Sequence, residues 1–199
     1  MREFWDTRYE TEEFVYGKEP NRFLSGELIK MKPGRILLPG EGEGRNAVFA
    51  ASHGWKVDAI DQSRNGANKA LRLARDNNLT INYEVGSIET IKLNKETYDV
   101  VAIVFVHLPP SLRTEVHSKL IESLKPGGRV ILEAFHRAQL GRSTGGPQSE
   151  AMLYTAPMLL NDFKTLKVFQ MQEIETELNE GVYHLGRACV IRFIGMKPT

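Results

Sequence analysis

The chain has 199 residues, 41% of them hydrophobic and 26% charged, which is typical of one globular domain and excludes global disorder. Its net charge of +1 gives no overall field for nucleic acid or an anionic membrane, and its single cysteine, Cys189, excludes an intrachain disulfide and a multi-cysteine metal site. Because the longest apolar run, residues 100–106, is too short for a membrane helix, we expect a soluble, cytoplasmic protein with one domain over residues 1–199.

The first 32 residues are polar and aromatic. Apolar side chains recur there at helical spacing from about Asn21 to Met31, which predicts a helix over that stretch. Pro33 ends it, because proline has no backbone donor to continue the hydrogen-bond pattern. We expect residues 1–32 to form a helical segment and lid over a cofactor-binding core at residues 33–199.

From residue 35 onward, short apolar runs alternate with helical patterns. The runs lack strict polar alternation, as buried parallel strands do, and lie at residues 35–39, 56–61, 81–85, 98–106 and 129–135. The helical patterns lie between them at residues 46–53, 63–77 and 111–125, and Pro126 with the following glycines is predicted to stop the third helix. Two extended runs, 167–178 and 183–196, flank the turn residues 179–181. We therefore predict an α/β fold: a Rossmann-like, doubly wound, seven-stranded sheet, mostly parallel, with a C-terminal antiparallel β-hairpin.

The most informative segment is LLPGEGEGRN, at residues 37–46. A predicted strand ends there, three glycines follow and a helix begins, an arrangement that lets a ligand approach the backbone closely. Asp61 ends the next strand about 20 residues after Gly40, the spacing at which such domains place an acid on ribose hydroxyls. We therefore expect a nucleoside-containing cofactor at this turn.

Two cofactor classes fit a glycine turn followed by a ribose-binding acid. A nicotinamide or flavin dinucleotide needs a third small residue where this chain has Arg45, and its pyrophosphate is disfavoured by Glu41 and Glu43. S-adenosylmethionine has a sulfonium, an ammonium and no phosphate, so the acidic loop suits it better. A turn without any ligand is the remaining alternative, since a glycine motif alone is a weak signal.

In their order and spacing, the motifs of this chain resemble the class I S-adenosylmethionine-dependent methyltransferases, in particular the tellurite-resistance (TehB-like) group. The similar segments span nearly the whole chain: FWDTRY at 4–9, YGKEPN at 16–21, GEGEGRN at 40–46, VDAID at 57–61 and LKPGG at 124–128. The resemblance implies a methyltransferase enzyme with S-adenosyl-L-methionine as its cofactor.

The resemblance also implies which residues hold the cofactor. Asp61 would bind the ribose hydroxyls and Gln62 would lie beside the adenine. The other implied contacts are Gly40 and Gly42 with the methionine moiety, Ser87 and Ile88 with the adenine ring, Val104 and Phe105 with the far side of the methionyl group, and Arg8 and Tyr16 from the N-terminal segment. Core packing is the alternative role for Ile88, Val104 and Phe105.

Two positions depart from the pattern of the family. Leu38 stands where the first strand often carries an acid, and Ser87 stands where an acid often follows the third strand. A hydroxyl accepts a hydrogen bond more weakly than a carboxylate, so these changes bear on cofactor affinity more than on cofactor identity.

The methyl acceptor is predicted to be a small molecule, because the chain lacks a basic track interleaved with aromatic residues and the acceptor loops typical of nucleic-acid methylation. His107 and His136 follow two central strands and are weak candidates for catalytic bases, with ordinary loop histidines as the alternative. The other three histidines, His53, His117 and His184, are predicted to be structural. No ligand spacing indicates a metal site, and none is expected.

The glycine-rich stretch at residues 137–150 is long for a connection and is predicted to cover the active site together with residues 1–20. Arg137 and Arg142 within it would face an anionic acceptor, or else lie on a solvated surface loop. We therefore expect methyl transfer by direct displacement to a thiol, a chalcogen oxyanion or a similar small molecule. The alternative is a non-catalytic S-adenosylmethionine-binding or adaptor protein on the same fold, and the oligomeric state stays open.

Overall fold

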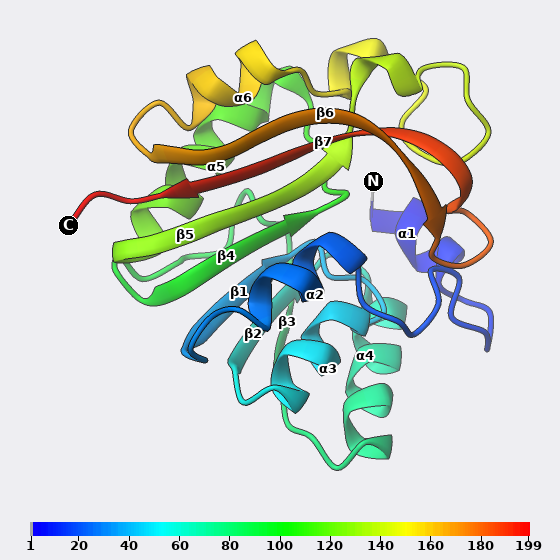
Figure 1. Cartoon of the computed structure of the whole chain (residues 1–199). Coiled ribbons are helices and arrows are strands. Elements are labelled where there is room, and N and C mark those ends of the chain that lie inside the picture. The colour runs from blue at the N-terminus through cyan, green and yellow to red at the C-terminus, as the bar shows by residue number, and fades with distance from the viewer. Residues whose placement is uncertain (1) are drawn as a thin grey trace.

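The structure, a computed structural model, describes residues 2–199 and contains one seven-stranded sheet with helices on both faces (Figure 1). The strands are β1 (Arg35–Pro39), β2 (Lys56–Asp61), β3 (Asn82–Val85), β4 (Tyr98–Val104), β5 (Leu124–Phe135), β6 (Lys167–Asn179) and β7 (Leu185–Met196). The helices are α1 (Arg2–Arg8), α2 (Arg22–Leu28), α3 (Arg45–Ser52), α4 (Arg64–Asp76), α5 (Pro110–Ser123) and α6 (Ala156–Asp162), with 3₁₀ turns at Arg137–Gln139 and Glu150–Met152. Across the sheet the order is β3-β2-β1-β4-β5-β7-β6, and only the pairings of β7 are antiparallel. The predicted fold class is confirmed.

Alternation along the central strands divides the core into two layers. On β1, Ile36 and Leu38 pack with α2, α3 and α4, whereas Leu37 between them packs on the opposite face with the core that includes α5 and α6. All three side chains are fully buried. Because both faces of the sheet are covered, its central strands carry apolar residues at consecutive positions, and this explains the unbroken apolar runs in the sequence.

Two helices end earlier than predicted. The helix predicted over residues 21–31 spans only Arg22–Leu28, and Asn21 is its N-cap, accepting the N–H of Leu24 at 2.9 Å. The helix predicted to run to residue 125 ends at Ser123, so Pro126 lies inside β5 instead of stopping a helix. The physical reason is that β5 already pairs with β4 at Leu124, with an irregularity before the next pair.

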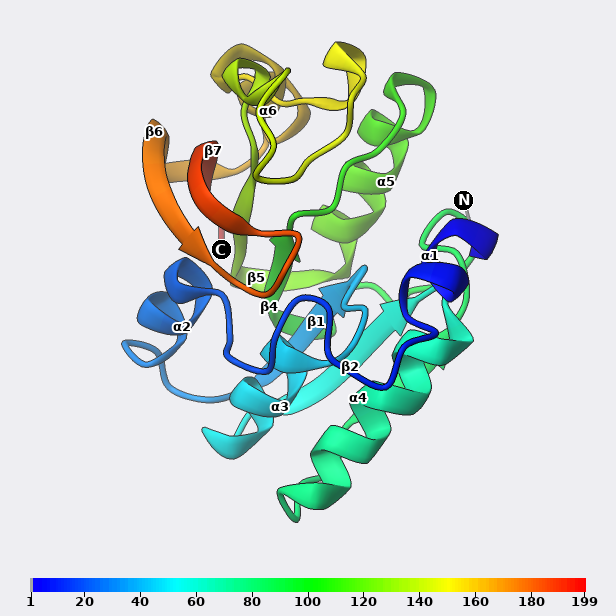
Figure 2. The same ribbon diagram turned by 90° about the vertical axis from the view of Figure 1, so that its right-hand side faces the viewer.

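The order of the strands places a crevice at the carboxyl ends of β1 and β4. The chain progresses from β1 outward through β2 to β3, then returns to the other side of β1 to form β4, so the connections leave β1 and β4 in opposite directions. Open α/β sheets bind ligands at the carboxyl ends of the strands at such a reversal. Figure 2 shows the N-terminal segment beside the β6–β7 turn near these strand ends, where the N–H of Val182 donates to the carbonyl of Val15 at 3.1 Å.

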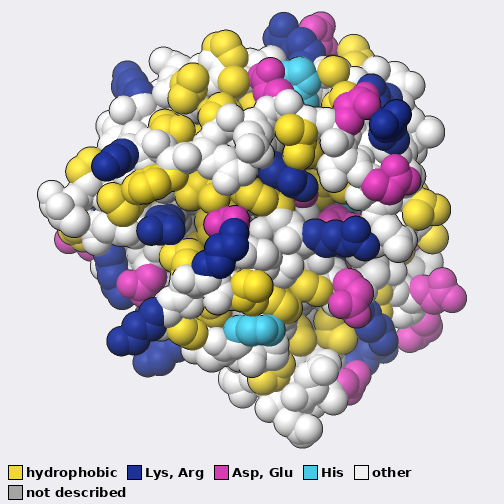
Figure 3. Space-filling view, viewed as in Figure 1, with side chains coloured by type: hydrophobic (Ala, Val, Ile, Leu, Met, Phe, Trp, Pro, Cys, Tyr) yellow, Lys and Arg dark blue, Asp and Glu magenta, His cyan; other side chains and the backbone are white. Residues whose placement is uncertain are grey.

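The surface is mixed in charge. On the face shown in Figure 3, basic and acidic side chains are interspersed without separating into two regions. Within residues 2–199, no helix combines the length and the apolar character needed to cross a bilayer.

Candidate functional site

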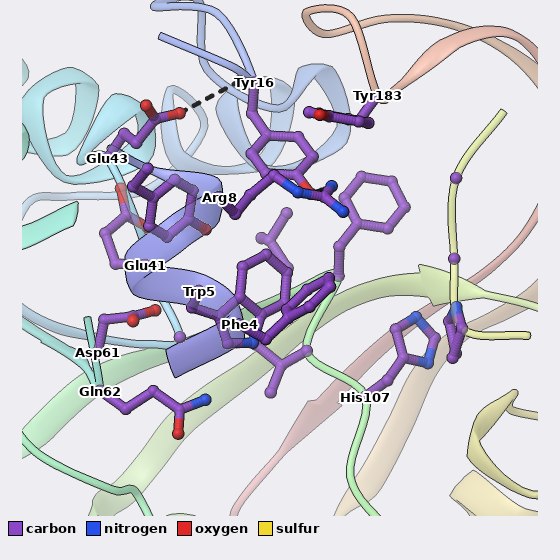
Figure 4. A pocket seen from close by; sticks show the side chains of 18 of the residues that line it. Phe4, Trp5, Arg8, Tyr16, Glu41, Glu43, Asp61, Gln62, His107 and Tyr183 are labelled. Atoms are coloured by element: carbon purple, nitrogen blue, oxygen red, sulfur yellow. Dashed lines mark hydrogen bonds between the residues drawn. The ribbon is translucent and has the colours of Figure 1, made fainter. Parts of the chain in front are cut away.

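A cavity of about 640 Å³ lies at the carboxyl ends of β1, β2 and β4 (Figure 4). Its wall combines the glycine loop, the segments that follow β2, β3, β4 and β5, the β6–β7 turn and the N-terminal segment. Asp61 and Gln62 lie at one side of it, and His107 and Tyr183 lie at the other. The cavity therefore gathers side chains from nearly the whole length of the chain.

The loop after β1 brings backbone into the cavity wall. Gly40 has a φ of +66°, and a Cβ at this position would lie 2.7 Å from Cγ2 of Val106. Its N–H donates to the carbonyl of Ile60 at 2.7 Å, which ties the loop to the end of β2. At Gly44, with a φ of +90°, a Cβ would lie 2.7 Å from Cα of Ala70 in α4. Side chains at these two positions would therefore strain the backbone and separate packed elements.

Asp61 both supports the loop and faces the cavity. Its Oδ2 accepts the N–H of Gly42 at 3.1 Å, and its Oδ1 accepts the N–H of Ser63 at 2.8 Å. Burial raises the pKa of Asp61 to about 6 in spite of these hydrogen bonds. Each carboxylate oxygen accepts more than one hydrogen bond, so Asp61 keeps acceptor capacity for hydroxyl groups in the cavity.

Glu41 provides the cap that α3 otherwise lacks. The N-cap of α3 is Gly44, which has no side chain, and Oε1 of Glu41 accepts the N–H of Ala47 at 2.7 Å instead. Burial raises the pKa of Glu41 to about 7, so the group is only partly ionised near neutral pH. A cation in the cavity would favour the charged forms of both Glu41 and Asp61.

Glu43, the other loop acid, holds the N-terminal segment. Its two oxygens accept the N–H groups of Val15 at 3.3 Å and Tyr16 at 3.2 Å, the second drawn in Figure 4. Lys69 in α4 donates to the same carboxylate at 2.7 Å, and both members of this ion pair are buried. The negative charge of Glu43 is therefore used to attach the segment and is not free in the cavity.

The start of the N-terminal segment is attached to α4 and to the β6–β7 turn. Asp6 of α1 accepts the hydroxyl of Ser63 at 2.7 Å, at the N-cap of α4. Arg8 donates to the hydroxyl of Tyr16 at 3.3 Å, and its guanidinium lies over the ring of Tyr183, 3.8 Å from the centroid. These contacts place Arg8 and Tyr16 in the wall of the cavity.

A buried polar network connects the segments around the site. Asn21 donates to Glu133 at 2.6 Å and to Glu180 at 3.0 Å, and Arg45 donates to the other oxygen of Glu180 at 2.7 Å. Arg192 of β7 pairs with the second oxygen of Glu133. Because each carboxylate oxygen has a partner, the network favours one arrangement of the N-terminal segment, the glycine loop, β5 and the β6–β7 turn.

The structure brings together almost all of the predicted cofactor-binding residues. The cavity wall contains Arg8, Tyr16, Gly40, Asp61, Gln62, Ser87, Ile88, Val104 and Phe105. Gly42 is not in the wall: its N–H donates to Asp61, and its carbonyl accepts the hydroxyl of Tyr83 at 2.6 Å. Gly42 therefore stabilises the conformation of the loop without lining the cavity.

Phe105 has an unusual backbone conformation. Its φ is +52°, a region that residues other than glycine rarely adopt, and its N–H donates to the carbonyl of Glu133 at 2.7 Å. Strain of this kind clusters at functional sites, and here it lies in the cavity wall.

Neither of the two histidines predicted as candidate bases is free to take a proton from a molecule in the cavity. His107 lines the cavity, but its Nδ1 lies 2.7 Å from the carbonyl of Met152 and its Nε2 accepts the N–H of Phe135 at 3.2 Å. Burial lowers the pKa of His107 to about 4, and the one lone pair of the neutral ring is already engaged. His136 lies outside the cavity wall, where its Nδ1 accepts the N–H of Ala138 at 3.1 Å.

The stretch at residues 137–150 contributes to the wall, but its two arginines do not. Ser143, Gly145, Gly146, Pro147 and Gln148 line the cavity. Arg137 instead pairs with Glu150 at 3.2 Å, and Arg142 pairs with Glu175 of β6. The expectation that these arginines face an anionic acceptor is therefore not supported, because their charges are neutralised outside the cavity.

Several wall residues could not be inferred as such from the sequence. Phe4 and Trp5 lie beside Arg8. Tyr183 and His184 lie in the β6–β7 turn, although the sequence predicts a strand at these two positions. The aromatic FWDTRY run was a signal for the first pair. The sequence contains no signal that Tyr183 and His184 line the cavity, because their neighbours in the wall are distant in the chain.

Comparison with known proteins agrees with this geometry. Residues 36–128, slightly less than half of the chain, match the family described as a methyltransferase domain. The chain is 30% identical over 143 residues to a ubiquinone biosynthesis O-methyltransferase of Rickettsia akari, and 32% identical over 146 residues to that of Rickettsia typhi. These alignments cover 71% and 73% of this chain but only 57% and 59% of the relatives, so the chain spans less than two thirds of their length.

Solved structures show the same fold at low sequence identity. A protein whose structure is described under the conversion of a disulfide bond into a thioacetal group in echinomycin biosynthesis has a TM-score of 0.79, with 17% identity and coverage of 100% of this chain and 92% of that one. TehB from Haemophilus influenzae has a TM-score of 0.71, also with 17% identity, and the match covers 98% of this chain and 66% of TehB. Membership of the TehB-like group does not follow from these values.

Together the comparisons support the class of S-adenosylmethionine-dependent methyltransferases and imply S-adenosylmethionine as the cofactor. The residues present fit that molecule. Asp61 offers carboxylate oxygens for hydroxyl groups, and Gly40 leaves backbone without a side chain in the wall. Neither Glu41 nor Asp61 forms an ion pair with another described residue, and burial raises the pKa of both. A cationic ligand without phosphate suits this wall better than a pyrophosphate.

Proposed function

Because residues 36–128 match a methyltransferase domain, we propose that the whole chain is an enzyme that transfers a methyl group from S-adenosylmethionine to a small-molecule acceptor. The observation that carries the proposal is the contact between the glycine loop and the acid at the end of β2, with 3.1 Å between the nitrogen of Gly42 and Oδ2 of Asp61. This contact joins the glycine loop, whose Gly40 lines the cavity, to a carboxylate in the same wall, and we assign that carboxylate to the ribose.

Electrostatics supports a cationic cofactor. Of the acidic side chains in the cavity wall, Glu43 is paired with Lys69, whereas burial dominates the pKa values of Glu41 and Asp61 and raises both. A sulfonium and an ammonium would gain from these two carboxylates, while a phosphate would be repelled. The cation Arg45 offsets this only in part: its charge lowers the pKa of Glu41, but the guanidinium is paired with Glu180 at 2.7 Å.

When bound, S-adenosylmethionine supplies a methyl group on positively charged sulfur. In the proposed complex Asp61 accepts hydrogen bonds from the ribose, Ser87 and Ile88 flank the adenine, and Val104 and Phe105 pack against the methionyl group. Trp5, Arg8 and Tyr16 cover the cavity and exclude water, so that residues 1–32 act as a lid. Direct displacement needs such alignment and exclusion of water more than it needs a reactive side chain.

The part of the wall distant from Asp61 indicates the type of acceptor. It is formed mainly by apolar and aromatic side chains, including Phe135, Leu108, Met152 and Val182, and neither Arg137 nor Arg142 reaches it. We infer an acceptor with an apolar or aromatic body and an oxygen or sulfur nucleophile. The names of the Rickettsia relatives, which are O-methyltransferases, support an oxygen nucleophile.

Two measurements test the proposal. Calorimetric titration with S-adenosylhomocysteine should give one binding site per chain, and methyl-labelled S-adenosylmethionine should transfer label to at least one member of a panel of phenols, thiols, selenite and tellurite. Absence of binding would refute the proposed cofactor. Binding without transfer to any acceptor would instead favour a non-catalytic cofactor-binding protein.

A further inference from the structure

His184 occupies a position in the cavity that the mechanism above does not use. It lies at the end of the turn between β6 and β7, it is 6% exposed, and it lines the wall. Its ring packs against Tyr16, Phe105 and Phe135, with centroid separations of 4.7, 4.5 and 5.2 Å. Phe105 is a residue that we assign to the methionyl group and Phe135 is one that we assign to the acceptor, so His184 lies between the two proposed sites.

The two edges of the His184 ring face different surroundings. Nδ1 is buried without a hydrogen-bond partner among the described residues, and it lies 3.6 Å from Oε2 of Glu180. The opposite edge faces Gly145, a residue of the wall: a Cβ on Gly145 would lie 2.7 Å from Cδ2 of His184. Nε2, by contrast, is not one of the fully buried polar atoms that lack a partner, and it forms no hydrogen bond with the described residues, so Nε2 is the ring nitrogen that reaches the cavity.

On these observations, and resting on the proposed function, we propose that His184 is the general base that takes the proton from a hydroxyl or thiol acceptor. As the acceptor atom bonds to the methyl carbon, the bond between sulfur and that carbon breaks, its electron pair stays on sulfur, and the acceptor proton passes to Nε2. The positive charge thus moves from the sulfonium to the imidazole, which becomes an imidazolium beside the carboxylate of Glu180. An imidazole–carboxylate pair that is long before substrate binds commonly shortens in the reactive complex.

The groups around His184 keep it neutral before reaction. Burial lowers its pKa, Arg45 and Arg8 lower it further, and Glu180 opposes them. His107 faces it from the segment after β4, and its own low pKa keeps that ring neutral. A neutral imidazole at physiological pH is the form that accepts a proton, and His107 does not compete for this role because its lone pair is engaged by the N–H of Phe135.

A series of acceptors of graded acidity tests the role of His184. In the His184→Gln and His184→Asn variants, kcat for a phenol that is protonated at the assay pH should fall by about 10²- to 10⁴-fold, whereas a thiophenol that is already ionised should be affected less than about threefold. The acid limb of the wild-type kcat–pH profile, measured at saturating cofactor, should disappear in both variants. The control His53→Asn changes an exposed residue at the C-cap of α3 and should behave as wild type.

Readouts other than activity separate the possible failures. Calorimetry with S-adenosylhomocysteine should give wild-type affinity in the His184 variants, and NMR titration of labelled wild-type protein should place the pKa of His184 below its ordinary value. If both acceptors lose activity equally, or if NMR shows His184 protonated at neutral pH, the base role is refuted while the proposed function stands. If the wild type methylates no acceptor of the series, the proposed function itself fails.

Discussion

Arg45 and Glu180 form a buried ion pair at 2.7 Å, although 135 positions separate them in the chain, and both side chains are 7% exposed. Arg45 is the first residue of α3, directly after the glycine loop, and Glu180 lies in the β6–β7 turn. The pair therefore connects the predicted cofactor turn to the β6–β7 turn, whose Tyr183 and His184 line the cavity.

Removing one partner of this pair should destabilise the protein strongly. Arg45→Met leaves the Glu180 carboxylate buried without its cation, and we expect a loss of about 3–5 kcal/mol in the free energy of unfolding. The double variant Arg45→Met/Glu180→Met removes both charges and should recover part of that loss. Arg72→Met, which breaks the surface pair with Glu12, should cost less than about 1 kcal/mol. Urea denaturation checks all three, and equal costs for Arg45→Met and Arg72→Met would contradict the burial argument.

Asp61→Asn should weaken binding of S-adenosylhomocysteine. The amide is isosteric but uncharged, and hydrogen bonds to a charged acceptor contribute about 1.5–3 kcal/mol, so we expect a Kd that is roughly 10- to 100-fold higher by calorimetry. Asp58→Asn is the matched control, because Asp58 lies on the same strand but pairs with Arg35 outside the cavity wall. An unchanged Kd for Asp61→Asn would remove the ribose assignment.

Binding of the cofactor should release protons below neutral pH. The pKa of Glu41 is raised to about 7 and that of Asp61 to about 6, chiefly by burial, and a bound cation favours their charged forms. Affinity for S-adenosylmethionine should therefore rise with pH between about 5.5 and 7.5, by up to tenfold per pH unit for each group that ionises. Glu41→Gln should flatten the upper part of this dependence.

Glu41 and Asp61 should also make the free energy of unfolding depend on pH when no ligand is bound. Their raised pKa values mean that the folded state binds more protons than the unfolded state between about pH 4 and 7, so their contribution is present below pH 4 and lost as pH rises through 6 and 7. Glu41→Gln should therefore increase the free energy of unfolding more at pH 8 than at pH 5. Calorimetry checks the predicted change in affinity. Urea denaturation at both pH values checks the predicted change in stability. An affinity or stability difference that does not depend on pH would contradict it.

Glu43→Gln should loosen the N-terminal segment. The carboxylate accepts the N–H groups of Val15 and Tyr16 and pairs with Lys69, so its neutralisation should speed hydrogen exchange at those two amides at least about tenfold. Glu10→Gln, an exposed change in the same segment, should leave these rates as they are. Bound S-adenosylhomocysteine should slow exchange over residues 1–20 and 137–150, and unchanged protection there would count against the two segments as covers of the site.

The strands and helices that form the sheet could be predicted closely because they depend on local pattern. The apolar runs at β1 and β2 match their observed bounds, since strands covered on both faces carry apolar residues at successive positions. The spacing between Gly40 and Asp61 predicted a cofactor turn, because two adjacent parallel strands bring their carboxyl ends together. The bounds of helix α1, within the segment expected to be helical, could not be predicted, because none of its residues is buried and there is no apolar stripe to detect.

The sequence by itself therefore determined the fold class, which follows from periodicity. It also predicted a cofactor turn from the spacing between Gly40 and Asp61, and the resemblance to a family implied most of the other residues that line the cavity. Only the tertiary structure decided how the side chains with acid–base chemistry are used. It engages both nitrogens of His107, pairs Arg142 with Glu175 away from the cavity, and brings His184 from the end of the chain into the wall. Which hydrogen bonds and charges a side chain meets depends on contacts between distant segments, and no local pattern encodes those contacts.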